Sequence, residues 1–157
     1  LCEAIAKAYH LEDDVIAELK IAGELHDIGK IAIDESILNK SDKLSETEKV
    51  QMEHHPETGY RLLSTSREHY NIAEYVLSHH ERWDGAGYPK NIKGAEIHWG
   101  ARVIAIAESY EAMTSERFYQ KARSSEEAAA EIKKCSGTQF DPVIARVFVE
   151  KVLGLAW

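Results

Sequence analysis

The sequence of 157 residues is poor in cysteine and proline, with two and three of them respectively, and it has no long apolar run. No apolar stretch approaches the ~20 residues of a membrane-spanning helix, and no secretory signal is recognisable. Cys2 and Cys135 lack the paired spacing of a zinc knuckle. We therefore expect reduced thiols in a cytoplasmic protein that makes no contact with a membrane.

Basic residues are also in deficit. Lysine and arginine number 19 against 27 aspartates and glutamates, which gives a formal net charge of −8. A protein that binds DNA or RNA polymers needs a basic face, so we expect no such partner. If the substrate is an anion, local cations must overcome the negative background, and bound metal ions would do so most strongly.

Length and composition fit an ordinary globular domain. The chain is 44% hydrophobic and 29% charged, and its length is enough to bury a substantial core. We expect a single domain over residues 1–157. Because the first helical stretch is short and the first residue is Leu1, we also expect a fragment that lacks the start of its first helix and an upstream sensory or receiver domain.

Helical periodicity runs through almost the whole chain. Ser45 and Glu48 have the spacing of a capping box, and Pro56 should kink or restart the helix that follows. No segment alternates at period two for long enough to form a sheet. The prediction is an all-α domain whose helices include residues 12–28 and 70–80 and a central, buried helix over 101–113.

Histidines and carboxylates gather in three places: His26-Asp27, His55, and His79-His80. Taken alone, each histidine has an ordinary interpretation as a surface or core side chain. Successive helical side chains point about 100° apart, so His79 and His80 can face one centre only at a helix end. Together the clusters indicate a metal site, and histidine with carboxylate suits iron, manganese or zinc.

Two charged residues extend this hypothesis. Glu108 interrupts an apolar run, and a carboxylate on a buried helix is costly unless it is paired or binds a cation. Lys30 follows Asp27 by three residues, where its ammonium would stabilise a metal-bound anion. The alternative interpretations are a surface or salt-bridge role for Glu108 and a solvent-facing Lys30.

Five strings resemble the HD-GYP domains of bacteria, in the same order along nearly the whole chain. They are HDIGK at 26–30, HPETG at 55–59, HHERWDGAGYP at 79–89, IAIAESYEAMTSERFY at 104–119 and GTQFDP at 137–142. The resemblance implies an HD-superfamily helical bundle with a GYP loop. It also implies two or three divalent metal ions, commonly iron or manganese, and hydrolysis of cyclic di-GMP to linear pGpG or onward to GMP.

The resemblance further implies roles for individual residues. Asp27 would bridge two metals and Lys30 would assist at the scissile phosphate, while a metal-activated hydroxide attacks phosphorus. Tyr88 and Arg117 match positions that contact the dinucleotide. In some relatives the GYP loop instead docks a GGDEF-type cyclase domain. The implied metal ligands are His26, Asp27, His55, His79, His80 and Glu108.

The sequence departs from the family pattern in three respects. A histidine that usually precedes the HD pair on the first helix is absent, and His10 is a poor substitute for it. Glu108 stands in place of the usual aspartate. Phe118 and Gln120 replace a proline and a basic residue, which removes one nucleotide-binding cation. Small misplacements of catalytic groups can cost on the order of 100-fold in rate, so we expect lowered activity.

The leading hypothesis is a metal-dependent cyclic di-GMP phosphodiesterase domain, the output module of a longer bacterial signalling protein. The alternative is a non-catalytic module that binds the nucleotide or a GGDEF partner, which Glu108 and the absent histidine favour. A phosphohydrolase of the HD superfamily that acts on another nucleotide is disfavoured, because it would not require the GYP loop. A homodimer would suit a signalling output domain.

Overall fold

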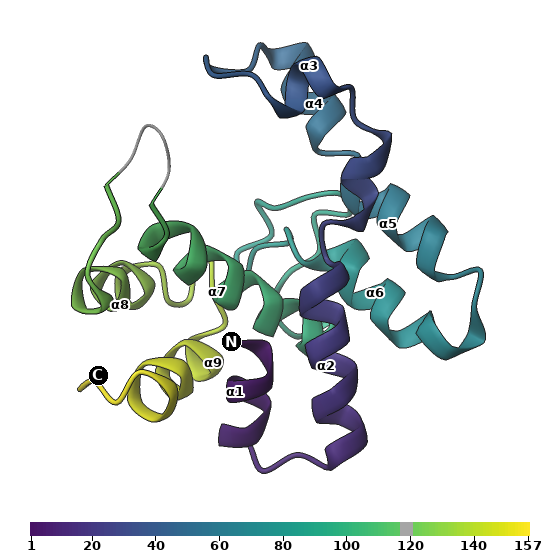
Figure 1. Ribbon diagram of the computed structural model, residues 1–157. Coiled ribbons are helices and arrows are strands. Elements are labelled where there is room, and N and C mark those ends of the chain that lie inside the picture. The colour runs from purple at the N-terminus through teal and green to yellow at the C-terminus, as the bar shows by residue number, and fades with distance from the viewer. Residues whose placement is uncertain (117–120) are drawn as a thin grey trace.

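The computed structural model describes residues 1–116 and 121–157, and helices account for almost all of its regular structure (Figure 1). Within these residues the only β contact is an isolated bridge between Ser136 and Phe140, so the all-α prediction is confirmed. The helices are α1 (Cys2–Ala8), α2 (Asp13–Leu25), η1 (Ile28–Ala32), α3 (Glu35–Leu38), α4 (Glu46–Met52), α5 (His55–Leu63), η2 (Arg67–His69), α6 (Tyr70–Ser78), η3 (Gly94–Glu96), α7 (Trp99–Thr114), α8 (Ser125–Lys134), α9 (Pro142–Val147) and the π-helix η4 (Phe148–Val152).

The core gathers around α7, which lies at the centre of the molecule (Figure 1). Ile104 and Ile106 of α7 are fully buried, and the ring of Tyr110 meets that of Phe148 edge-on at 5.2 Å between centroids. Each fully buried side chain of this size contributes roughly 1.5–3 kcal/mol to folding. The predicted central helix is therefore confirmed, and it extends to both sides of residues 101–113.

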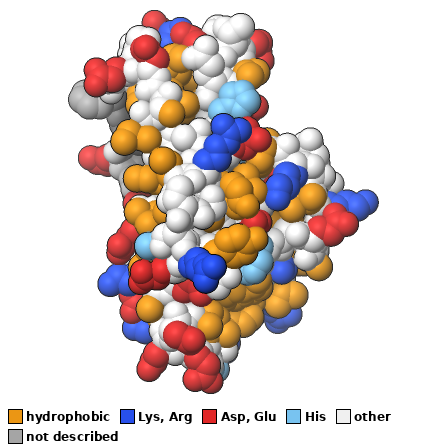
Figure 2. All heavy atoms as spheres, turned by 90° about the vertical axis from the view of Figure 1, so that its right-hand side faces the viewer, with side chains coloured by type: hydrophobic (Ala, Val, Ile, Leu, Met, Phe, Trp, Pro, Cys, Tyr) orange, Lys and Arg blue, Asp and Glu red, His pale blue; other side chains and the backbone are white. Residues whose placement is uncertain are grey.

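No helix in the described part of the chain has both the length and the apolar character needed to cross a bilayer. Both cysteines are free thiols, as the sequence predicted. On the face shown in Figure 2, acidic and basic side chains are interspersed with apolar patches.

The helix expected over residues 12–28 ends earlier than predicted. α2 stops at Leu25, His26 is its C-terminal cap, and the chain then tightens into the 3₁₀ turn η1. The His26 ring bonds to the carbonyl oxygen of Gly23, which a continued α-helix would offer to the backbone N–H of residue 27. A side-chain hydrogen bond thus replaces a backbone one at the point where the helix ends.

Two other predicted boundaries are confirmed. Ser45 and Glu48 form a complete capping box at the start of α4. After α4 the chain does not continue as one helix through Pro56. It restarts at His55, with proline in the first turn of α5, where no intrahelical N–H bond is needed.

Gly29 sets the distance between η1 and α5. A Cβ atom at this position would lie 1.9 Å from the carbonyl oxygen of His55 and 2.6 Å from the backbone nitrogen of Gly59. Gly59 is itself pressed against Val76 of α6. Backbone therefore packs directly on backbone here, which brings the segment after His26 next to the start of α5.

We expect Gly29→Ala to destabilise the domain by about 2–3 kcal/mol or more, because the added methyl group meets backbone atoms that must move. Gly23→Ala is the matched control. Its Cβ meets only the side chain of Cys2, at 2.9 Å from Sγ and 3.4 Å from Cβ, and alanine is favoured over glycine in a helix by about 1 kcal/mol. Urea unfolding followed by circular dichroism measures both. Equal stability of the two variants would show that the Gly29 contact does not constrain the fold.

Candidate metal centre

The clustered polar residues come from helix ends and from one side of the central helix. His26 caps the C-terminus of α2, His55 opens α5, and His79 caps the C-terminus of α6, with His80 following it. Glu108 lies on α7. Helix ends bring these residues together because the chain turns there, so that neighbouring side chains can point to one centre.

Three of the imidazole rings are held in the same way. Each directs Nδ1 at the carbonyl oxygen three residues earlier: His26 at Gly23 (2.8 Å), His55 at Met52 (2.7 Å) and His79 at Val76 (2.5 Å). A carbonyl oxygen only accepts, so Nδ1 must carry the proton. In the neutral ring, Nε2 then carries a lone pair, as a metal ligand requires.

The Nε2 atoms converge. Nε2 of His55 lies 3.3 Å from Nε2 of His79. The ligand atoms of His55, His79 and His80 all lie within 4.8 Å of one another. The His26 ring meets His79 edge-on at 5.4 Å between centroids.

Asp27 faces the same cluster. Its Oδ1 atom is 3.4 Å from Nε2 of His55, and Oδ2 is 3.6 Å from Nε2 of His26. The ammonium of Lys30 donates to Oδ2 at 2.6 Å. Oδ1 is buried and has no hydrogen-bond partner among the described residues, so one carboxylate oxygen remains available at the centre of the cluster.

The environment of these groups sets their charge. Burial lowers the pKa of His55, and it holds the pKa of His79 well below the usual range, with His80 adding to the effect. Burial and the nearby His55 lower the pKa of His80 to about 3. Burial alone would raise the pKa of Asp27, but the Lys30 hydrogen bond and His26 bring it below its ordinary value. At neutral pH the rings of His55, His79 and His80 are therefore neutral, and Asp27 is ionised.

These residues fit a divalent cation. Nε2 of His55 and Nε2 of His79 are both bare in the neutral rings, so two lone pairs face each other at 3.3 Å. The buried Oδ1 of Asp27 adds a third electron-rich atom. A cation between them removes the repulsion. Two imidazole nitrogens that bind one ion at about 2.1 Å also lie about 3 Å apart.

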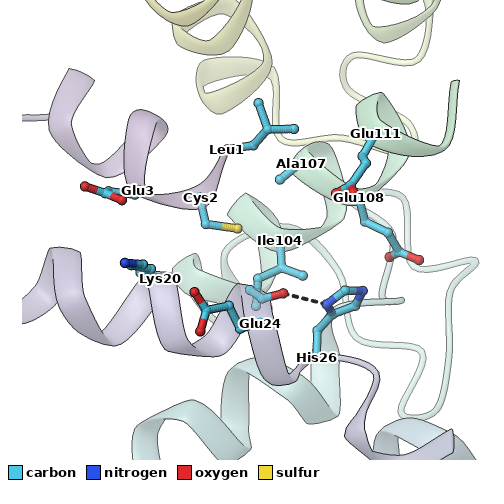
Figure 3. Close-up of a pocket in the computed structure, with 11 residues that line it drawn as sticks. Leu1, Cys2, Glu3, Lys20, Glu24, His26, Ile104, Ala107, Glu108 and Glu111 are labelled. Atoms are coloured by element: carbon cyan, nitrogen blue, oxygen red, sulfur yellow. Dashed lines mark hydrogen bonds between the residues drawn. The ribbon is translucent and has the colours of Figure 1, made fainter. Parts of the chain in front are cut away.

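Glu108 approaches the cluster from α7, with Oε2 4.0 Å from Nδ1 of His80. Glu108 and His26 also border a cavity of about 230 Å³ between α1, α2 and α7 (Figure 3). Glu24 and Glu111 line the same cavity. The cluster therefore has open, carboxylate-lined space on one side.

The GYP loop, residues 84–94, packs on the cluster through Tyr88. The ring of Tyr88 stacks on that of His80, with centroids 4.8 Å apart and planes inclined by 26°. Burial raises the pKa of the Tyr88 phenol, and Glu53 and Glu108 raise it further. The hydroxyl is thus neutral at physiological pH. Arg117, the other residue predicted to contact nucleotide, lies outside the described residues, as do Phe118 and Gln120.

The structure therefore brings eight of the nine predicted site residues into one region, and it adds one that had no predicted role. Glu81 is only 4% exposed, and its carboxylate accepts a hydrogen bond from the backbone of Lys90 in the GYP loop. The signal in the sequence was a carboxylate placed directly after two histidines and before a glycine-rich loop. Sequence patterns do not show that such a side chain is buried.

Comparison with known proteins agrees with this architecture. Residues 1–144 match the family model of the HD domain. The chain belongs to the HD domain family. The resemblance to HD-GYP domains is confirmed as well, because the curated relatives of this family match over most of the chain.

Several relatives are named as cyclic di-GMP phosphodiesterases. That of Thermotoga maritima is 38% identical over 148 residues, which cover 93% of this chain and 40% of the relative. That of Pseudomonas aeruginosa is 39% identical, covering 95% of this chain and 36% of the relative. A 3′3′-cGAMP-specific phosphodiesterase of Vibrio cholerae is 35% identical, covering 95% and 29%. The chain thus spans 40% or less of the length of these relatives.

The fold is shared with a solved structure. A cyclic GMP-AMP specific phosphodiesterase of Vibrio cholerae superimposes with a TM-score of 0.71 over 97% of this chain and 41% of that one, at 23% identity. The HD-type helical fold is therefore confirmed. HD phosphodiesterases imply divalent metal ions, and the histidine cluster fits this implication.

We expect His80→Ala to lower the affinity for manganese or iron by about 100-fold or more while the helical fold is kept, because the side chain is partly exposed and its loss leaves little void. His54→Ala is the control, since His54 is an exposed neighbour of the cluster that pairs with Glu57. Metal content after anaerobic loading and dialysis measures the effect. Full metal content in the His80 variant would remove this residue from the ligand set.

Proposed function

We propose that this domain is a metal-dependent phosphodiesterase that hydrolyses cyclic di-GMP to pGpG or GMP. The observation that carries the proposal is the convergence of bare imidazole nitrogens and the unpartnered Oδ1 of Asp27, with Lys30 and Tyr88 at the edge of the same site. The names of the relatives support cyclic di-GMP as the substrate.

The ligands in this proposal are His26, Asp27, His55, His79, His80 and Glu108, and they would hold two ions of iron or manganese. Mixed imidazole and carboxylate donors suit these metals. When bound, such ions lower the pKa of water and neutralise charge on a phosphoryl group. The cavity beside His26 carries two further carboxylates, Glu24 and Glu111, which supports room for a third cation there.

Asp27 and Lys30 act together in this mechanism. The Lys30 ammonium keeps Asp27 ionised and fixes Oδ2, so that Oδ1 points to the histidines. Both side chains remain about one-third exposed, so Lys30 can also donate to an entering phosphate. In the transition state this donor would stabilise the charge that develops on the phosphoryl oxygens.

Tyr88 orients the nucleotide. Because its phenol is neutral, the hydroxyl can donate a hydrogen bond to a phosphate or to a base. Its ring packs on His80, which ties this substrate contact to the position of a metal ligand. We propose that Arg117 supplies a further phosphate or guanine contact.

We further propose that residues 1–157 form one domain of a bacterial cytoplasmic signalling protein. Homodimers and GGDEF-domain proteins are the macromolecular partners that we propose for it.

Binding of nucleotide without turnover is the competing function. The observation that favours it is the 4.0 Å separation of Glu108 and His80, together with glutamate in place of the usual aspartate.

The proposal is tested with the chain loaded anaerobically with manganese or iron and given cyclic di-GMP or 3′3′-cGAMP, the products being resolved by chromatography. We expect pGpG or GMP from cyclic di-GMP, none of it from the His80→Ala variant, and slower turnover of 3′3′-cGAMP. Tight binding of cyclic di-GMP without product would establish the non-catalytic module instead. Faster cleavage of 3′3′-cGAMP would assign that dinucleotide as the preferred substrate instead.

We expect Lys30→Ala to lower kcat about 100-fold, the usual cost of losing one charge-stabilising donor, with metal content unchanged. Lys49→Ala is a matched control, because Lys49 and Glu46 form the same i,i+3 ion pair at the same 2.6 Å, but on the exposed face of α4. Steady-state kinetics of the loaded variants provide the measurement. Wild-type kcat in the Lys30 variant would exclude its role at the phosphate.

A further inference from the structure

Glu81 is the most deeply buried carboxylate near the cluster without a role in the mechanism above. The residue is 4% exposed. Its Oε1 atom accepts a hydrogen bond from the backbone N–H of Lys90 at 2.6 Å. Its Oε2 atom is buried and has no hydrogen-bond partner among the described residues. Burying a carboxylate is costly unless hydrogen bonds or a paired cation offset the lost hydration.

The bond from Glu81 joins two segments that the mechanism needs in register. Glu81 directly follows the histidine pair, and Lys90 lies nine residues later, just after the Tyr88-Pro89 step. A hydrogen bond to a charged acceptor is about twice as strong as one between neutral groups. Glu81 therefore spans the base of the GYP loop with a single strong contact.

The other contacts between residues 80–82 and residues 87–88 are longer or steric. The backbone N–H of Tyr88 donates to the carbonyl oxygen of His80 at a long 3.3 Å. Gly87 lies so close to this segment that a Cβ atom would be 2.5 Å from the His80 oxygen and 2.4 Å from the Arg82 nitrogen. The Gly87 contact limits how near the loop can come, and the long Tyr88 bond holds it less firmly than a short bond to a carboxylate.

The start of the loop is anchored elsewhere. The backbone N–H groups of Trp83 and Asp84 donate to the carbonyl oxygens of Gln139 and Thr138, at 3.2 and 2.8 Å. The start of the loop is thus fixed to the segment before α9, and its end is tied back where the N–H of Gly94 donates to the carbonyl oxygen of Trp83 at 3.0 Å. Between these two ends, the bond from Glu81 holds Lys90 next to the histidine segment. Movement at Lys90 would carry Tyr88 away from the ring of His80.

We propose that Glu81 is a positioning residue: through its bond to Lys90 it holds Tyr88 over His80 and so sets the nucleotide contact relative to the metal ligands. The catalytic part of this inference rests on the proposed phosphodiesterase function. The mechanical part, that Glu81 holds the loop, stands apart from it.

Three substitutions separate the hydrogen bond from the charge. Glu81→Ala removes both. Glu81→Gln removes the charge but keeps an oxygen that accepts from Lys90. Glu81→Asp keeps the charge but is one methylene shorter, so it falls short of Lys90. Glu96→Ala is the matched control, because Glu96 accepts a backbone N–H, that of Lys93, at 3.3 Å in an exposed part of the same loop.

Each metal-loaded protein is examined by hydrogen exchange over residues 87–91, by metal content, and by kinetics with cyclic di-GMP. For the Ala and Asp variants we expect the Lys90 amide to exchange about 10- to 100-fold faster, the range of one hydrogen bond to a charged group. KM should rise about tenfold or more, with a smaller change in kcat and full metal content. The Gln variant should stay within about threefold of wild type, as should Glu96→Ala.

The outcomes that overturn the proposal are distinct. Unchanged exchange in the Ala and Asp variants would show that Glu81 does not hold the loop. A Gln variant as impaired as the Ala variant would assign the effect to charge. If Glu81→Ala fails to fold, the Gln and Asp pair still decides, because they differ in reach and charge. If the wild type hydrolyses no cyclic dinucleotide, the proposed function fails, while hydrogen exchange still tests the loop.

Discussion

The anchoring of three imidazole rings by backbone carbonyls is the constraint on which the rest of the site depends. Each Nδ1–H donates to the carbonyl oxygen of the residue three positions earlier, so Nε2 of each neutral ring is left bare. With Nε2 of His55 and Nε2 of His79 at 3.3 Å, the arrangement repels itself until a cation is bound. Metal binding should therefore also stabilise the fold, since a ligand that binds only the native state adds its binding free energy to stability.

Close backbone packing supplies the geometry that the rings need. Gly29 allows η1 to lie against the start of α5 with no side chain between them, and this contact sets the distance between Asp27 and His55. The apolar core around α7 lies beside the cluster, and none of the clustered histidines or carboxylates belongs to it. The packed helices thus fix the positions of the proposed ligands, while the polar cluster carries the electrostatic cost of burial.

Much of this could be predicted from the sequence, and the exceptions have a common cause. The capping box at Ser45, the restart at Pro56 and the buried central helix follow from local chemistry and periodicity, which are properties of neighbouring residues. The end of α2 at Leu25 was missed, because a side-chain bond from His26 competes with the backbone there. The burial of Glu81 was missed as well, because it depends on a contact nine residues away.

Glu108, one of the departures from the family pattern, lies on the cavity side of the cluster. His55, His79, His80 and Tyr88 form a tightly packed half, with ring centroids 4.1 to 5.3 Å apart among the contacting pairs. The half that contains His26 and Glu108 borders the cavity of about 230 Å³, and the replacement of aspartate by glutamate falls there. A longer side chain is tolerated where there is space, whereas an extra methylene in the packed half would displace a ring. Variation among relatives that act on different cyclic dinucleotides is therefore expected on the cavity side, with the histidine pair and the base of the GYP loop held constant.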